Sequence, residues 1–154
     1  MPSLRNAIVA ACKAAIDQAG KPAGSVVRRY MTQTETEEKS FNVLPLGQKS
    51  TEEFRPGAGY ITTHMLTVGV VVRARQGGEA AKGLAPDELL DPLLVWAVQA
   101  LMADPTLGGI AIGVAEDEIT WDVESFDQEF ARALQTFTVM LRTNATDPTS
   151  EPSA

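Results

Sequence analysis

YITTHMLTVGVVVRAR, residues 60–75, alternates apolar and polar side chains in the way that is typical of a β-strand. Four even positions are apolar and four odd positions are polar or charged: Leu66, Val68, Val70 and Val72 against Thr63, Thr67, Arg73 and Arg75. Because successive side chains of a strand point to opposite faces of a sheet, we expect one packed face and one largely solvated face. His64, the single histidine, is in phase with Leu66, which predicts a partly buried structural role.

An amphipathic helix is predicted ahead of this strand. Ser3 is a suitable N-cap, and apolar residues follow it at intervals of three and four: Leu4, Ile8, Ala11, Cys12, Ala15 and Ile16. Cys12, the only cysteine, is interpreted as a small core residue rather than a nucleophile. Short strands are expected at residues 25–31 and 41–46, with a turn or mobile loop at 32–39 between them.

Two long exposed loops are predicted, one on each side of the 60–75 strand. Residues 47–59 are polar and contain Pro56, and within them Phe54 and Arg55 have no evident local partner. Residues 76–85 contain three glycines and show no regular pattern. Loops of this length are usually either functional or disordered, so both are candidates for contacts with partner proteins.

A second helix and a terminal pair of strands are predicted in the second half of the chain. Asp91 and Pro92 read as an N-cap followed by proline at the first helical position, and the expected buried stripe is Leu94, Val98, Leu101 and Met102. Trp96 lies off the centre of this stripe, so it either covers the edge of the core or faces a neighbouring protein. Residues 118–124 and 131–142 alternate as strands, the second with Phe137, Val139 and Leu141 on its packed face.

This order of elements predicts an α+β fold. Runs of strands with few helices between them favour a mainly antiparallel mixed β-sheet of about four to five strands, packed by two main helices. Residues 1–143 are expected to form a single domain. Residues 144–154 are polar, contain two prolines and lack an apolar stripe, which predicts a disordered C-terminal tail.

The composition excludes several classes of protein. The chain has 154 residues, of which 44% are hydrophobic and 21% charged, and its formal net charge is −7. No apolar run approaches the roughly 20 residues that span a bilayer, and no export signal precedes the first helix, so a soluble protein is expected. The basic residues are scattered rather than clustered, which predicts no sequence-specific binding of nucleic acid.

Gly108 and Gly109 raise the question of a phosphate-binding loop. Such a loop leads from a strand into a helix whose free N–H groups face the anion. Here the glycines follow a predicted helix and precede an Ile/Val-rich run, and neither GxGxxG nor GxxxxGK[ST] occurs. We interpret them as a turn, in which glycine at the helix end relieves the steric cost of a left-handed residue.

No catalytic, cofactor-binding or metal-binding residues are predicted. One side of the predicted strand at residues 118–124 carries three carboxylates: Glu118, Asp122 and Glu124. Paired carboxylates can act as general acid and base or bind a divalent ion, so the alternative to a purely structural protein is a small ligand-binding or hydrolytic α+β domain. An exposed edge strand carries the same pattern, because charges discourage unwanted strand pairing. The second interpretation is favoured, and with it a protein that binds other proteins rather than an enzyme.

Several segments, taken in chain order, resemble a known family. They are the short first helix, the extended Ser40-Phe41-Asn42-Val43-Leu44-Pro45, a glycine-bearing polar loop, the Val-rich strand, Leu90-Asp91-Pro92-Leu93-Leu94 in a helix, Ala103-Asp104-Pro105-Thr106-Leu107-Gly108-Gly109, and a last strand ending Val139-Met140-Leu141-Arg142-Thr143. Together they resemble the tail terminator, or tail completion, family of long-tailed bacteriophages, which includes the minor tail protein U of phage lambda. Residues 32–39 and the tail after Thr143 depart from the family pattern.

The resemblance implies a structural virion protein without catalytic residues. Its members assemble as a ring, typically a hexamer, on the last ring of the tail tube, end tail polymerisation and offer the surface to which the head attaches. The implied partners are copies of the chain itself, the major tail tube protein and the head–tail connector or neck proteins. The implied location is the head-proximal end of the tail in the virion, after assembly in the host cytoplasm. A neighbouring connector or stopper protein of the neck is the alternative within the virion.

Five residues are predicted to make protein contacts: Phe54, Arg55, Arg73, Arg75 and Trp96. The two loops at 47–59 and 76–85 are expected to supply axial or inter-subunit contacts, with Phe54 and Arg55 as anchors. An acidic ring interior would also suit a passage for the genome, because it repels DNA.

Overall fold

The computed structural model describes residues 3–30, 37–57, 59–78 and 81–144. These residues form one five-stranded sheet of order β1-β2-β3-β5-β4 and two α-helices. The elements are α1 (Leu4–Ile16), β1 (Ser25–Arg28), β2 (Lys39–Arg55), β3 (Gly59–Arg75), α2 (Pro86–Met102), β4 (Gly113–Asp122) and β5 (Phe130–Asn144). β1 runs parallel to β2, and every other neighbouring pair is antiparallel. The predicted α+β class and mixed, mainly antiparallel sheet are confirmed.

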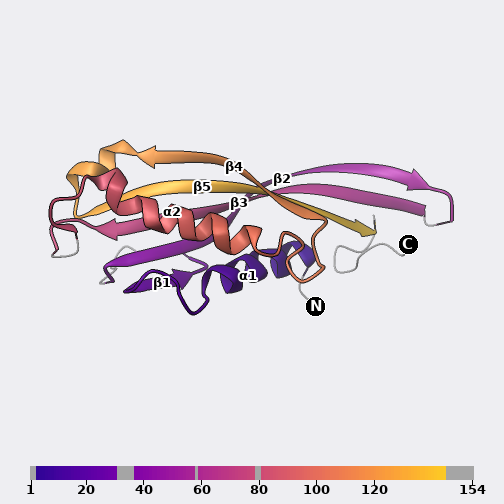
Figure 1. Cartoon of the computed structure of the whole chain (residues 1–154). Coiled ribbons are helices and arrows are strands. Elements are labelled where there is room, and N and C mark those ends of the chain that lie inside the picture. The colour runs from indigo at the N-terminus through magenta and orange to yellow at the C-terminus, as the bar shows by residue number, and fades with distance from the viewer. Residues whose placement is uncertain (1–2, 31–36, 58, 79–80, 145–154) are drawn as a thin grey trace.

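The helices and the sheet form two layers, with α1 and α2 on the same face of the sheet (Figure 1). The even-numbered apolar residues of the central strand β3 face the helices and are buried, as predicted: Leu66, Val68, Val70 and Val72. The predicted packed face of β5 is buried with them: Phe137, Val139 and Leu141. The period-two pattern was sufficient here, because both strands lie inside the sheet under the helix layer.

α1 forms as predicted. The Ser3 Oγ accepts a hydrogen bond from the Asn6 N–H at 3.2 Å, which satisfies one of the free donors of the first turn. Four residues on one side of the helix are buried: Ile8, Val9, Cys12 and Ile16. Burial raises the pKa of the Cys12 thiol to about 12, so this cysteine is the inert core residue that its apolar setting predicted.

α2 begins earlier than predicted. Its first residue is Pro86 and its N-cap is Ala85, whose N–H donates to the Glu88 carboxylate at 3.1 Å; Pro92 therefore lies inside the helix. The predicted start was wrong because Pro86 and Pro92 both suit the first turn of a helix. Leu89 and Leu90, which precede Pro92, are buried, and this favours a helix that begins at Pro86. The buried stripe is Leu89, Leu90, Leu93, Leu94, Ala97 and Leu101, whereas Met102 is exposed.

The predicted loop at residues 47–59 is also wrong. β2 continues without a break in the chain to Arg55, turns through Pro56 and Gly57, and pairs with β3 along its whole length apart from one bulge between Pro45 and Gly47. The polar side chains hid this strand, because backbone hydrogen bonds to β3, rather than burial, hold it extended.

The remaining boundaries differ in detail. β1 ends at Arg28, and Lys39, predicted in a loop, begins β2; residues 31–36 lie outside the described residues. β4 ends at Asp122, after which residues 123–127 form a 3₁₀ turn. Asn144, assigned to the tail, belongs to β5, and the rest of the predicted tail lies outside the described residues.

Candidate protein interaction surfaces

The most prominent feature is an arm made of residues 47–55 of β2 and residues 59–67 of β3. It projects past the helix layer (Figure 1). The layer ends near the first turn of α1, where the Arg5 Nη1 donates to the Gln48 Oε1 at 3.1 Å. Beyond this point residues 49–54 are all exposed. The arm therefore offers a surface that the helices of the same chain do not cover.

Two aromatic side chains lie at the tip of the arm. Phe54 is paired with Tyr60 across the hairpin, their ring centroids are 5.3 Å apart at an interplanar angle of 61°, and they are 59% and 57% exposed. The Arg55 guanidinium next to them lies 3.7 Å from the Glu53 carboxylate. Sequence reasoning found Phe54 and Arg55 but missed Tyr60. The signal was the Pro56-Gly57 turn, which places residues 54 and 60 opposite each other.

A polar cluster occupies the helix-side face at the base of the arm. The His64 Nδ1 is 2.8 Å from the Gln48 Nε2 and 2.7 Å from the Ser50 Oγ, and its Nε2 is 2.9 Å from the Thr143 Oγ1. Burial and, secondarily, the positive charge of Arg5 lower the pKa of His64 below 6.5. The histidine is half-buried, as predicted, and it links β2, β3 and β5 through neutral hydrogen bonds.

Arg73 and Arg75 lie at the opposite end of β3 from the arm tip. Both guanidinium groups stack on the Phe130 ring, at 4.9 and 5.1 Å from its centroid, and Arg75 also lies 3.1 Å from the Glu129 carboxylate. Arg73 is buried, and Arg75 is half-buried. The predicted solvated face is thus wrong at this end of the strand, because cation–π packing covers the arginines. Their role in protein contacts stays a prediction.

Trp96 joins the two helices and borders a groove between them. Its indole N–H donates to the Ile16 carbonyl at 2.9 Å, across the α1–α2 contact. The groove has a volume of about 410 Å³ and is lined by Ala15, Gln18, Trp96, Gln99, Ala100, Ala103 and Asp104. Of the two readings of Trp96, covering the edge of the core describes this contact, and the exposed part of the ring remains open to a partner.

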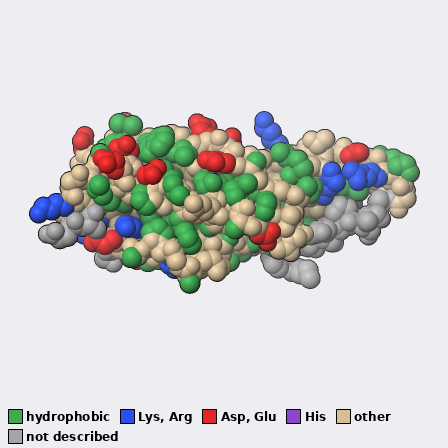
Figure 2. Space-filling view, in the orientation of Figure 1, with side chains coloured by type: hydrophobic (Ala, Val, Ile, Leu, Met, Phe, Trp, Pro, Cys, Tyr) green, Lys and Arg blue, Asp and Glu red, His purple; other side chains and the backbone are tan. Residues whose placement is uncertain are grey.

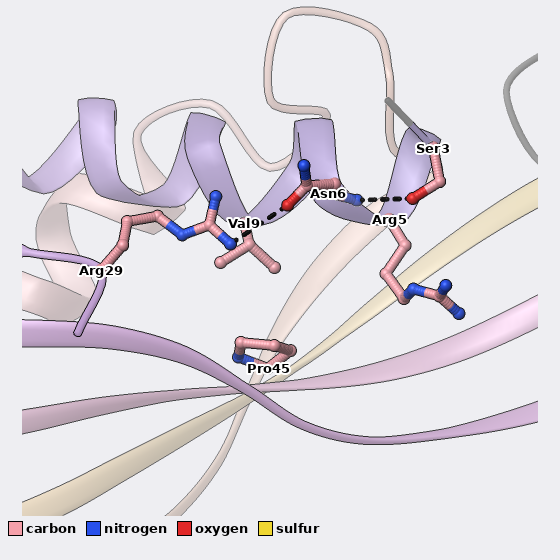
Figure 3. Close-up of a pocket in the computed structure, with 6 residues that line it drawn as sticks. All are labelled: Ser3, Arg5, Asn6, Val9, Arg29 and Pro45. Carbon is pink, nitrogen blue, oxygen red and sulfur yellow. Dashed lines mark hydrogen bonds between the residues drawn. The ribbon is translucent and has the colours of Figure 1, made fainter. Parts of the chain in front are cut away.

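A second depression, of about 330 Å³, lies between α1 and β2 (Figure 3). Arg5 and Arg29 occupy opposite ends of it, while Val9 and Pro45 form apolar walls. The Arg29 Nη2 donates to the Asn6 Oδ1 at 3.2 Å, which turns this guanidinium toward the helix. The depression adds two positive charges near the base of the arm.

β4 forms an acidic outer edge of the sheet. It contains four carboxylates and no basic residue: Glu116, Asp117, Glu118 and Asp122. Figure 2 shows acidic side chains over the part of the molecule that carries α2 and β4, and both basic and acidic side chains on the arm. Asp122 pairs with Arg132 at 3.0 Å, and Glu124 lies in the 3₁₀ turn rather than in line with the strand. Among the described residues, no three His, Cys, Asp or Glu side chains are placed to hold a metal ion.

Gly108 and Gly109 lie in a turn between α2 and β4, the order that the sequence indicated. The helix itself ends at Met102, and its C-cap residue, Ala103, has a right-handed conformation, so the glycines do not cap it. Leu107, Gly108 and Gly109 have φ of 50°, 75° and 92°, a run of left-handed residues that reverses the chain into β4.

The five predicted contact residues thus fall in three places. Phe54 and Arg55 share the arm tip, Arg73 and Arg75 share the far end of β3, and Trp96 borders the groove between the helices. Neither a protein-family model nor a curated protein sequence matches the chain. In the described part of the chain, no helix is long and apolar enough to cross a membrane.

Proposed function

We propose that this protein is a structural subunit of a bacteriophage tail, which forms a ring on the tail tube, ends tube polymerisation and provides the surface to which the head attaches. The proposal rests on the resemblance carried by residues 103–109 and the order of elements around them. It implies no catalytic step, and the partners are copies of the chain, the tube protein and the neck proteins.

The main structural support for a ring is that one sheet has two different open edges. Residues 113–122 of β4 pair only with β5, and β2 pairs with β1 only over residues 39–42, so within the described residues its outer edge is free from Val43 to Arg55. A cyclic ring requires two unlike, complementary patches on each subunit. Two unlike edges at opposite sides of a sheet meet this requirement.

The distribution of charge supports the same assembly. Four carboxylates on β4 would repel a second β4 edge, so pairing of two like edges is disfavoured. The arm carries Lys49 and Arg55 together with Glu52 and Glu53, so these charges cancel, and Arg142 lies beside it on β5. Repulsion between like β4 edges therefore favours a contact between unlike parts of neighbouring copies, which is a head-to-tail arrangement.

The first experiment measures mass and tube capping together. Mass photometry of the purified chain is expected to give a discrete ring of several copies, hexameric if the family pattern holds. Addition of this ring to polymerising tail tube protein is expected to shorten the tubes and to place extra density at one end in electron micrographs.

The binding partner distinguishes a tail terminator from the alternative within the virion, a connector or stopper protein of the neck. A ring that leaves tube length unchanged and binds purified portal or adaptor protein is a connector or stopper. A chain that remains monomeric and has no effect on tubes contradicts the proposed function. Heat-denatured protein, added at the same concentration, controls for non-specific effects on tube growth.

A further inference from the structure

The aromatic tip of the arm lies on the side of the sheet that bears the core. Tyr60 and Leu66 have the same parity on β3, and the β2–β3 register has no shift between them, so both side chains belong to the helix-covered face. Phe54 joins this face because it is paired directly with Tyr60. At the tip, however, the helix layer has ended, and the two rings are more than half exposed. Beyond the polar cluster around His64, this face therefore ends in two aromatic rings with no helix over them.

The same chain carries an apolar groove that is open to the outside. The groove between α1 and α2 has alanine methyl groups and the Trp96 ring in its lining, and its volume of about 410 Å³ lies within the range of ligand-sized clefts, about 300–1,000 Å³. The hydrogen bond from Trp96 to Ile16 fixes the indole, so the ring is held in place before a partner arrives. A rigid aromatic wall favours aromatic partners in edge-to-face or offset stacking.

A basic side chain at the tip and an acidic side chain at the groove form a complementary pair. Arg55 follows Phe54 at the tip, with a side chain that is 42% exposed and lies 3.7 Å from the Glu53 carboxylate. Asp104 stands at the groove, where hydrogen bonds from the Gly108 and Thr106 N–H groups and the Thr106 hydroxyl orient its carboxylate. An arginine arriving with the aromatic rings would therefore meet a carboxylate that is already positioned.

We propose that the arm tip of one copy inserts Phe54 and Tyr60 into the α1–α2 groove of a neighbouring copy, with Arg55 against Asp104. The arm projects away from the helices of its own chain (Figure 1), so the contact joins two copies. Tip and groove are unlike patches of one subunit, which makes the contact heterologous and able to propagate around a ring. The inference rests on the proposed ring for its biological meaning, but it is testable without any phage component.

Cysteine cross-linking tests this contact directly. In the Tyr60→Cys/Ala100→Cys double variant, oxidation is expected to give a ladder of disulfide-linked oligomers up to the full ring on non-reducing gels. A disulfide requires Cα atoms within about 7 Å, so the ladder reports close approach of tip and groove. Cys12 is buried and does not interfere. The matched control is Tyr60→Cys/Val95→Cys, which places the second thiol at an exposed site of α2 outside the groove lining and is expected to give no ladder.

Removal of the rings tests whether they anchor the contact. Phe54→Ala/Tyr60→Ala is expected to weaken association about 30-fold or more, the effect of losing a hot spot, while far-UV circular dichroism stays unchanged because both rings are exposed. Phe54→Tyr/Tyr60→Phe keeps two aromatic rings and is expected to retain assembly.

The outcomes separate this contact from the proposed function. Rings that form without a cross-link ladder and survive Phe54→Ala/Tyr60→Ala overturn the arm-to-groove contact and leave the ring standing. Rings that keep their mass in this variant but lose tube binding assign the tip to the tube protein, which also overturns it. A cross-link ladder from a chain that forms no closed ring and does not cap tubes supports the contact and contradicts the proposed function.

Discussion

Asp104 organises the turn between α2 and β4. Its Oδ2 accepts from the Gly108 N–H at 2.8 Å, and its Oδ1 accepts from the Thr106 hydroxyl at 2.9 Å and from the Thr106 N–H at 3.3 Å. These donors, the Gly108 N–H first, lower the pKa of Asp104 below 3.8. The motif that first suggested a phosphate site is thus completed by a carboxylate of the chain itself, which uses the N–H groups that an anion would need.

Neutralising this carboxylate is expected to change how stability depends on pH. A lowered pKa in the folded state means that the ionised Asp104 stabilises the fold above pH 3.8 and that this contribution is lost as the pH falls through the folded pKa. Asp104→Asn should therefore destabilise the protein more at pH 7 than at pH 3. Urea unfolding at both pH values, at one fixed protein concentration, measures the difference; Asp91→Asn, at an exposed position of α2, is the control. An equal loss at both pH values contradicts this account.

A side-chain hydrogen bond from Trp96 connects the two helices. Trp96 is half-buried and donates to the carbonyl of the last residue of α1, at a helix end where carbonyls have no partner within the helix. The amphipathic pattern of α2 could not reveal this bond, because the acceptor is eighty residues earlier in the chain.

Removing the indole donor is expected to loosen the helix layer. Trp96→Phe keeps an aromatic ring but leaves the Ile16 carbonyl without its donor, so the free energy of unfolding should fall by about 1–2 kcal/mol. Trp121→Phe, on the 42%-exposed ring of the edge strand β4, is the matched control and should change it by less than about 0.5 kcal/mol. Urea unfolding followed by far-UV circular dichroism gives both values. Equal changes in the free energy of unfolding for the two substitutions would show that the Trp96–Ile16 hydrogen bond does not stabilise the fold.

The acidic edge of β4 has a consequence for the assembly of the whole molecule. Its open backbone groups can pair with another strand, and repulsion between its carboxylates opposes pairing of two β4 edges. Glu116→Gln/Asp117→Asn/Glu118→Gln is therefore expected to raise non-specific association, seen as larger particles in dynamic light scattering, with little change in secondary structure.

A control with the same change in net charge isolates the edge effect. Asp91→Asn/Glu124→Gln/Asp127→Asn removes three exposed carboxylates outside β4 and should leave particle size unchanged. If both triple variants associate equally, net charge rather than edge protection governs association.

Local patterns were enough for those parts of the fold in which one face is buried. The alternation in residues 60–75, the Ser3 cap with its apolar stripe and the apolar positions of 131–142 predicted β3, α1 and β5, because burial of one face imposes a period on the sequence. The α+β class follows from their order. The start of α2 was misplaced because two prolines satisfy the same local rule.

Local sequence patterns predicted the core-facing elements and drew attention to two residues of the arm tip, Phe54 and Arg55. Three further features depend on the folded chain: residues 47–55 are a strand, Tyr60 completes the tip and Trp96 borders an open groove. All three have the same cause. Each depends on backbone pairing or on contacts between distant segments, and a polar strand held by ladder hydrogen bonds leaves no hydrophobic period to read.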